Sequence, residues 1–99
     1  MKRILLVCSA GMSTSLLVVK MQDEAALRGM DVDIQAHGNS DIQRLKSDFD
    51  VCLVGPQIKF SIDQIAADLA PMPVEVIDMR IYGLADGAGA LDQALLLIK

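Results

Sequence analysis

The sequence predicts an α/β fold in which a parallel sheet carries helices on both faces. Apolar runs typical of strands alternate with segments of helical periodicity along all 99 residues. The opening run, Arg3–Val7, is aliphatic after its first residue, as expected of a strand that is covered on both sides. The sequence has no linker, repeat or low-complexity stretch, so we expect one domain over residues 1–99.

The first half of the chain predicts two strands and two helices. After the opening strand, residues 13–30 have apolar side chains at helical spacing and predict a helix that Gly29 stops. Residues 31–36 alternate between apolar and polar, which indicates a strand near an edge of the sheet. A short helix should follow, because Ser40 and Gln43 have the spacing of a capping box.

The second half repeats this alternation. Residues 50–55 predict a third strand, and residues 74–77 predict a fourth strand after a turn that contains Pro71 and Pro73. Between them one helix is expected, with its apolar stripe formed by Ile58, Ile62, Ile65, Ala66 and Leu69. A C-terminal helix follows a Gly-rich turn, and its apolar positions are Leu91, Ala94, Leu95 and Ile98.

The charge of the chain excludes several kinds of partner. A net charge of −4 argues against nucleic acid, whose phosphates recruit clusters of Lys and Arg, and against an anionic membrane surface. No apolar run approaches the ~20 residues that span a bilayer. The start of the chain superficially suggests a signal peptide, but its short apolar stretch runs into a polar loop and is better explained as a buried strand. We therefore expect a cytoplasmic protein without direct membrane insertion.

Cysteine and histidine are rare in this chain. The two cysteines, Cys8 and Cys52, are far apart and form no disulfide framework, which fits a reducing cytosol. With one histidine, His37, and no CxxC motif, we do not expect a structural zinc site. Cys52 lies between Val51 and Leu53 in an aliphatic strand, so we interpret it as an inert core residue.

The loop after the first strand is the expected site of chemistry, because ligands of open parallel sheets bind beyond the carboxyl ends of the strands. It consists of Cys8, Ser9, Ala10, Gly11, Met12, Ser13, Thr14 and Ser15. Its small residues let backbone amides approach an oxyanion as a nest, and the helix N-terminus that follows adds positive potential. Such a loop stabilises a thiolate and then holds the oxygens of a phosphoryl group on the sulfur. We therefore expect Cys8 to be a nucleophile and residues 9–15 to bind phosphate, which requires that solvent reach the sulfur.

This loop has three other interpretations: a structural cysteine, a nucleotide-binding loop and a phosphatase site. Cys8 could be a structural residue of a non-catalytic binding module, since unpaired cysteines often serve as small core residues. A Walker-type nucleotide loop needs a lysine at the helix mouth, and none occurs between Arg3 and Lys20. A low-molecular-weight tyrosine phosphatase or arsenate reductase requires an arginine where this chain has Thr14. The missing guanidinium weakens the case for hydrolysis and suits a site that keeps a thiophosphate intact.

The segment at 7–17, Val-Cys-Ser-Ala-Gly-Met-Ser-Thr-Ser-Leu-Leu, resembles the phosphorylation loop of enzyme IIB of the bacterial sugar phosphotransferase system, lactose/cellobiose (chitobiose) type. Supporting matches at 53–58, 74–78 and 82–83 extend the resemblance over essentially the whole chain. Galactitol- and ascorbate-type IIB domains also have cysteine loops that end in Thr-Ser, but the residues between are closer to the cellobiose type.

The resemblance implies both a fold and a function. The fold is a three-layer sandwich with a four-stranded parallel sheet in the order 2-1-3-4, similar to low-molecular-weight tyrosine phosphatases. The phosphohistidine of a IIA protein donates its phosphoryl group to Cys8. The phosphocysteine then passes this group to a sugar of the cellobiose, chitobiose or lactose type, which the membrane IIC permease binds during uptake. Neither step needs a metal or a nucleotide.

Several side chains outside the loop have two interpretations. Gln57 follows the turn after the third strand and either hydrogen-bonds the loop or the phosphate, or is an ordinary residue of a first helical turn. Tyr82, the only tyrosine, either contacts the phosphate or a partner at the same end of the sheet, or only packs. Met12 either docks partner proteins or fills space. His37 follows a strand and is interpreted as a surface or turn residue.

No catalytic role is expected for the aspartates. Asp41, Asp48 and Asp78 are interpreted as helix-start or solvated residues. A small acidic domain without an obvious exposed apolar stripe favours a monomer that contacts its partners transiently.

Overall fold

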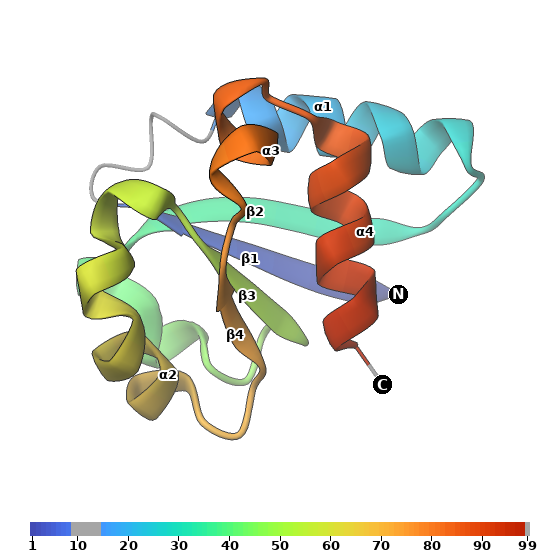
Figure 1. The fold of residues 1–99 in the computed structure, drawn as a ribbon. Helices are drawn as coiled ribbons and strands as arrows, with labels where there is room; N and C mark the ends of the chain where they lie inside the picture. The colour runs from blue at the N-terminus through green and yellow to red at the C-terminus, as the bar shows by residue number, and fades with distance from the viewer. Residues whose placement is uncertain (9–14, 99) are drawn as a thin grey trace.

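The computed structural model describes residues 1–8 and 15–98, except the side chains of Asn39 and Asp41. A parallel sheet of four strands forms its centre, in the order β2-β1-β3-β4 (Figure 1). The strands are β1 (Lys2–Cys8), β2 (Val32–Gly38), β3 (Val51–Val54) and β4 (Val74–Val76). The helices are α1 (Ser15–Leu27), α2 (Ile62–Leu69), α3 (Met79–Gly83) and α4 (Gly87–Leu97), with 3-10 helices η1 (Asn39–Leu45) and η2 (Pro56–Ser61). The predicted edge position of the second strand is confirmed.

The two faces of the sheet carry separate layers of helices. α1 and α4 cover one face, and α2 covers the other together with η1 and η2 (Figure 1). Successive side chains of a strand point to opposite faces. Accordingly, Ile4 and Leu6 of β1 pack beneath α1 and α4, whereas Leu5 and Val7 pack on the side of α2. All four are completely buried, which explains why this strand is aliphatic rather than alternating.

The end of α1 agrees with the predicted stop at Gly29. This residue has a φ of +67°, a left-handed conformation that glycine adopts without strain. The amides of Gly29 and Met30 donate to the carbonyl oxygens of Ala26 and Ala25 at 3.1 and 2.9 Å, respectively. This pair of bonds is a Schellman motif, which ends the helix and turns the chain back into β2.

The capping box expected at Ser40 is wrong. The helix begins at Asn39, as expected, but it is of the 3-10 type and its N-cap is Gly38, so Ser40 lies inside the first turn and does not cap it. The side-chain nitrogen of Gln43 donates to Oδ1 of Asp68 in α2, at 3.1 Å. This side chain therefore links two helices on one face of the sheet.

The single helix expected between residues 58 and 69 is divided in two. Pro56 opens η2, where Ile58 has the non-helical angles φ −119° and ψ 28°, and α2 begins only at Ile62. Ile58, Ile65 and Leu69 are nevertheless all buried in the same layer. The apolar stripe thus identified these three buried side chains correctly, whereas Ile62 and Ala66 are only partly buried, and it did not reveal the break in the backbone.

The short helix α3 between the last strand and α4 is absent from the sequence prediction. Asp78 begins it, because its side chain accepts hydrogen bonds from the amides of Arg80 and Ile81 at 2.9 and 3.2 Å. The interpretation of Asp78 as a helix-start residue is therefore confirmed. α4 begins within the Gly-rich segment, at Gly87, where Asp86 accepts a hydrogen bond from the amide of Gly89 at 3.0 Å.

Candidate functional site

Cys8 is the last residue of β1, an internal strand, at the carboxyl end of the sheet. Its register partner in β2 is Gly38, and on the other side Gly55 follows β3 and donates its amide to the Val7 oxygen at 2.8 Å. Cys8 therefore lies between two residues without side chains. Ser15, the last residue of the predicted phosphate loop, is exposed at the start of α1. The other predicted loop residues, Ser9, Ala10, Gly11, Met12, Ser13 and Thr14, lie outside the described residues.

The side chain of Cys8 is 0% exposed in this structure. The open sulfur that a nucleophile requires is therefore not observed. Phosphoryl transfer at this position requires that the sulfur become accessible, and its position at the end of β1 leaves the carboxyl edge of the sheet as the side of approach.

Gln57 and Tyr82 are brought together at this end of the sheet. The side-chain nitrogen Nε2 of Gln57 donates to the Tyr82 hydroxyl at 2.7 Å, across 25 residues of sequence. A Cβ atom placed on Gly55 would lie 2.9 Å from Oε1 of Gln57 and 3.4 Å from the Cβ of Cys8. Gln57 thus lies beside Gly55, next to the cysteine, and it holds Tyr82 at the same site.

Tyr82 owes its position to α3. The amide of Ile77 donates to the Val54 oxygen at 2.8 Å, which extends the pairing of β4 with β3. Asp78 then caps α3, and the Tyr82 ring packs against the core layer beneath α1 and α4. The packing role expected for Tyr82 is therefore present together with its contact to Gln57. The start of α3 could have been found from Asp78, but the Gln57 contact has no signal in the sequence.

Cys52 differs from Cys8 in its surroundings. It lies inside β3, it is 0% exposed, and it packs in the layer beneath α2. Burial raises the pKa of the Cys52 thiol to about 12, because an apolar environment disfavours the thiolate. Neither cysteine is in a disulfide. The interpretation of Cys52 as an inert core residue agrees with these properties.

His37 is placed differently from the prediction. It lies within β2 rather than after it, paired in register with Val7. Its ring makes an edge contact with Phe49, with a centroid distance of 6.3 Å and an interplanar angle of 67°. Its Nε2 atom is 3.1 Å from Oε1 of Gln35. Asp48 is exposed, as expected, and the side chain of Asp41 lies outside the described part.

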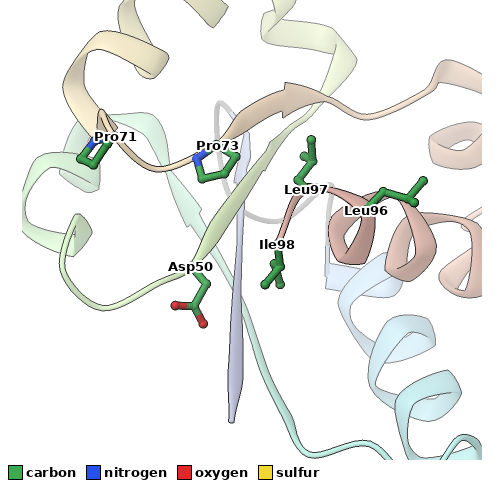
Figure 2. A pocket seen from close by; sticks show the side chains of 6 residues that line it. All are labelled: Asp50, Pro71, Pro73, Leu96, Leu97 and Ile98. Atoms are coloured by element: carbon green, nitrogen blue, oxygen red, sulfur yellow. The ribbon is translucent and has the colours of Figure 1, made fainter.

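One cavity of the described residues lies away from Cys8. It has a volume of about 670 Å³ and is lined by Asp50, Pro71, Pro73, Leu96, Leu97 and Ile98 (Figure 2). These residues lie at the amino ends of β3 and β4 and at the end of α4, whereas Cys8 lies at the carboxyl end of the sheet. We therefore do not include this cavity in the candidate site. Within the described residues, none of the helices has the length and apolar character to cross a bilayer.

Solved structures of IIB components have this fold. The solution structure of the cellobiose-specific phosphotransferase IIB component protein from Borrelia burgdorferi has a TM-score of 0.83 and 32% identity, and the match covers 98% of this chain and 91% of that one. The lactose-specific IIB component domain from Streptococcus pneumoniae has a TM-score of 0.82 at 14% identity, covering 99% and 98% of the two chains, and supports the fold alone. The fold is thus that of a phosphotransferase IIB domain, and the predicted sheet order is confirmed.

Sequence comparisons narrow this class to one family. The family described as PTS system, lactose/cellobiose-specific IIB subunit matches residues 3–93. The oligo-beta-mannoside-specific EIIB component of Bacillus subtilis is 46% identical, over 99% of this chain and 97% of the relative. The cellobiose-specific EIIB component of Lactococcus lactis subsp. lactis is 43% identical, over 94% and 93%. The chain belongs to the lactose/cellobiose-specific IIB family, whose members are phosphotransferase components that work with IIA and IIC partners in sugar transport.

Proposed function

We propose that this chain is a phosphoryl carrier whose working atom is the sulfur of Cys8. The phosphohistidine of a IIA protein is the donor, and the acceptor is a hydroxyl group of a sugar held by a membrane IIC permease. The sugar is of the cellobiose, chitobiose or lactose type. This class is consistent with the printed specificities of the relatives, which include cellobiose, galactose and oligo-beta-mannosides.

The reaction consists of two displacements at phosphorus. In the first, the thiolate of Cys8 forms an S–P bond while the N–P bond of the donor breaks, and the donor histidine keeps the bonding electrons. In the second, the sugar hydroxyl forms an O–P bond and loses its proton, while the S–P bond breaks and the thiolate is restored. Positioning and charge stabilisation supply most of the catalysis of such transfers.

The position of Cys8 is the observation that carries the proposal. A thiol ends an internal strand at the carboxyl end of a parallel sheet, directly before the segment that leads into α1. The other cysteine is enclosed in the core, where burial keeps its thiol protonated at neutral pH. This contrast favours Cys8 over Cys52 as the cysteine that exchanges a phosphoryl group.

The proposal requires an opening step, because Cys8 is 0% exposed. We assign this step to contact with a partner protein at the carboxyl edge of the sheet. Residues 9–15 are proposed to bind the phosphoryl group through their backbone amides, and Gln57 and Tyr82 are proposed to support the site. The carrier is further proposed to work in the cytoplasm as a monomer, without metal or nucleotide.

Intact-mass measurement tests the proposal directly. After incubation with a phosphorylated IIA protein, the wild-type chain should gain the mass of one phosphoryl group. Cys8→Ser should not gain a stable adduct, whereas Cys52→Ala should gain it as the wild type does. A wild-type chain that never gains this mass, or a Cys8→Ser variant that gains it equally, overturns the proposal.

The same experiment distinguishes a carrier from a hydrolase. Thr14 stands where phosphatases of similar topology need an arginine, so we expect the adduct to persist after the donor is removed. Rapid release of inorganic phosphate from the wild type would instead favour a phosphatase activity.

A further inference from the structure

The side-chain amide of Gln57 has a defined orientation. Its nitrogen Nε2 donates to the Tyr82 hydroxyl at 2.7 Å. Its oxygen Oε1 is on the side of Gly55, 2.9 Å from the point where a Cβ of that residue would lie, and the same point is 3.4 Å from the Cβ of Cys8. The acceptor end of the amide therefore lies beside Gly55, the residue next to Cys8 in the sheet, and the donor end faces Tyr82.

This orientation suits a thiol and opposes a phosphate. A carbonyl oxygen only accepts hydrogen bonds, so it is compatible with a neighbouring S–H group. A phosphoryl group carries about −1.5 to −2 charge at neutral pH, and its oxygens also only accept. Phosphorylation of Cys8 therefore favours the reverse orientation, in which Nε2 of Gln57 faces the phosphate.

Tyr82 permits both orientations. A tyrosine hydroxyl donates as well as accepts a hydrogen bond. When the Gln57 amide makes a half-turn, the Tyr82 hydroxyl can donate to Oε1 instead of accepting from Nε2. The contact between the two side chains is then kept, and only the direction of its hydrogen bond is reversed.

We propose that Gln57 binds the phosphoryl group of phosphocysteine through Nε2, and that Tyr82 is the positioning residue that holds the amide in either orientation. The inference rests on the proposed function, since it needs a phosphoryl group on Cys8. Gly55 belongs to the same arrangement, because a side chain at this position would displace the Gln57 oxygen. Its φ of −61° and ψ of 140° suit any residue, so this steric effect is separable from the backbone conformation.

Substitutions at Gln57 test the donor role. Gln57→Glu has nearly the same shape, but its carboxylate is negative and only accepts hydrogen bonds. At equilibrium with a phosphorylated IIA protein, we expect the ratio of phosphorylated to unphosphorylated chain to fall about tenfold in this variant. This is the lower end of the effect of losing a hydrogen bond to a charged group, because Gln57 is exposed. The matched control is Gln64→Glu on α2, where the amide bonds Asp68, and it should keep the wild-type ratio.

Two further variants test the arrangement around Gln57. Tyr82→Phe and Gly55→Ala should each lower the ratio several-fold, and either change should have little additional effect in the Gln57→Glu background. In wild-type protein labelled with ¹⁵N, the side-chain amide signals of Gln57 should shift on phosphorylation, and this shift should be smaller in Tyr82→Phe. A purely structural role for these residues would move the unfolding midpoint instead of these signals.

The outcomes separate this inference from the proposed function. A wild type that is phosphorylated on Cys8, with Gln57→Glu reaching the same ratio and the Gln57 amide signals unchanged, overturns the inference and leaves the carrier function intact. A wild type that takes up no phosphoryl group overturns both. Loss of phosphorylation in Gln64→Glu as well as Gln57→Glu would mean that added negative charge alone is responsible, which also overturns the inference.

Discussion

At the scale of single residues, the two cysteines are distinguished by their neighbours rather than by burial, since both are 0% exposed. Cys52 is surrounded by apolar side chains of the layer beneath α2, and its pKa is raised to about 12. Cys8 ends its internal strand between Gly38 and Gly55, at the carboxyl end of the sheet. Of the two cysteines, only Cys8 therefore stands at the end of its strand.

We expect this difference to appear in alkylation rates. At neutral pH, Cys8 should react with iodoacetamide much faster than Cys52, because only the thiolate is nucleophilic and the Cys52 thiol stays protonated. Peptide mass mapping after timed quenching gives both rates from one sample. Equal rates would contradict the assignment of a thiolate-stabilising site to Cys8, as would a Cys8 that reacts only after unfolding.

At the scale of elements, the short helix α3 depends on its first residue for the position of Tyr82. Asp78→Ala removes the acceptor for the amides of Arg80 and Ile81 and should lower the free energy of unfolding by about 1 kcal/mol. Asp78→Asn keeps a capping oxygen and should stay within about 0.5 kcal/mol of the wild type. Urea unfolding measures both. An equal loss in both variants would show that the charge of Asp78, rather than its cap, stabilises α3.

The contact between α1 and α4 depends on the absence of a side chain at Gly87. A Cβ at this position would overlap the backbone carbonyl of Lys20 in α1. Gly87→Ala should therefore push the helices apart and destabilise the fold by about 1–3 kcal/mol, as overpacked cores do. Gly83→Ala is the matched control, because a Cβ there meets nothing within 4 Å, and it should be neutral or slightly stabilising. Equal unfolding free energies for the two variants would contradict the close approach of the helices.

The sequence predicted elements well where burial alone determines them. The aliphatic strands and the stop at Gly29 needed only apolar pattern and glycine chemistry. The break at Ile58 was missed because the same side chains remain buried on either side of it. The helix α3 was missed because five residues, of which none is buried, produce no periodic signal.

At the scale of the whole molecule, the stability of the fold depends on pH through Cys52, because the helix layers that flank the sheet bury its thiol. Its folded pKa of about 12 lies above the ordinary value of about 8.5, so the folded chain holds this proton more tightly than the unfolded chain does. The resulting stability is complete below about pH 8.5 and is lost as the pH rises toward 12, by up to about 1.4 kcal/mol per pH unit.

This part of the pH dependence should be absent when the thiol is removed. Relative to the wild type, Cys52→Ala should lose less unfolding free energy between about pH 8.5 and 11, whereas groups common to both proteins affect both equally. Urea unfolding at a series of pH values measures the difference. Parallel curves for the two proteins would mean that the pKa of the Cys52 thiol is the same in the folded and unfolded states.

The candidate site was predictable only in part, because some of its residues are close in the sequence and others come together only in the fold. Cys8 could be found because strand end, small residues and helix start are adjacent in the sequence. The partnership of Gln57 with Tyr82 joins η2 to α3 and exists only once the sheet has formed. Its discovery therefore required the tertiary structure.

The direction of the strands has a practical consequence. Met1 precedes β1, and Ile98 lies with Asp50 and Pro73 at the amino ends of β3 and β4, so both ends of the described chain lie at that end of the sheet (Figure 1). They are separated from the end that carries Cys8 by the length of β1, roughly 20 Å. A fluorescent reporter, a surface tether or a fused domain at either terminus should therefore leave the thiol end open to incoming proteins.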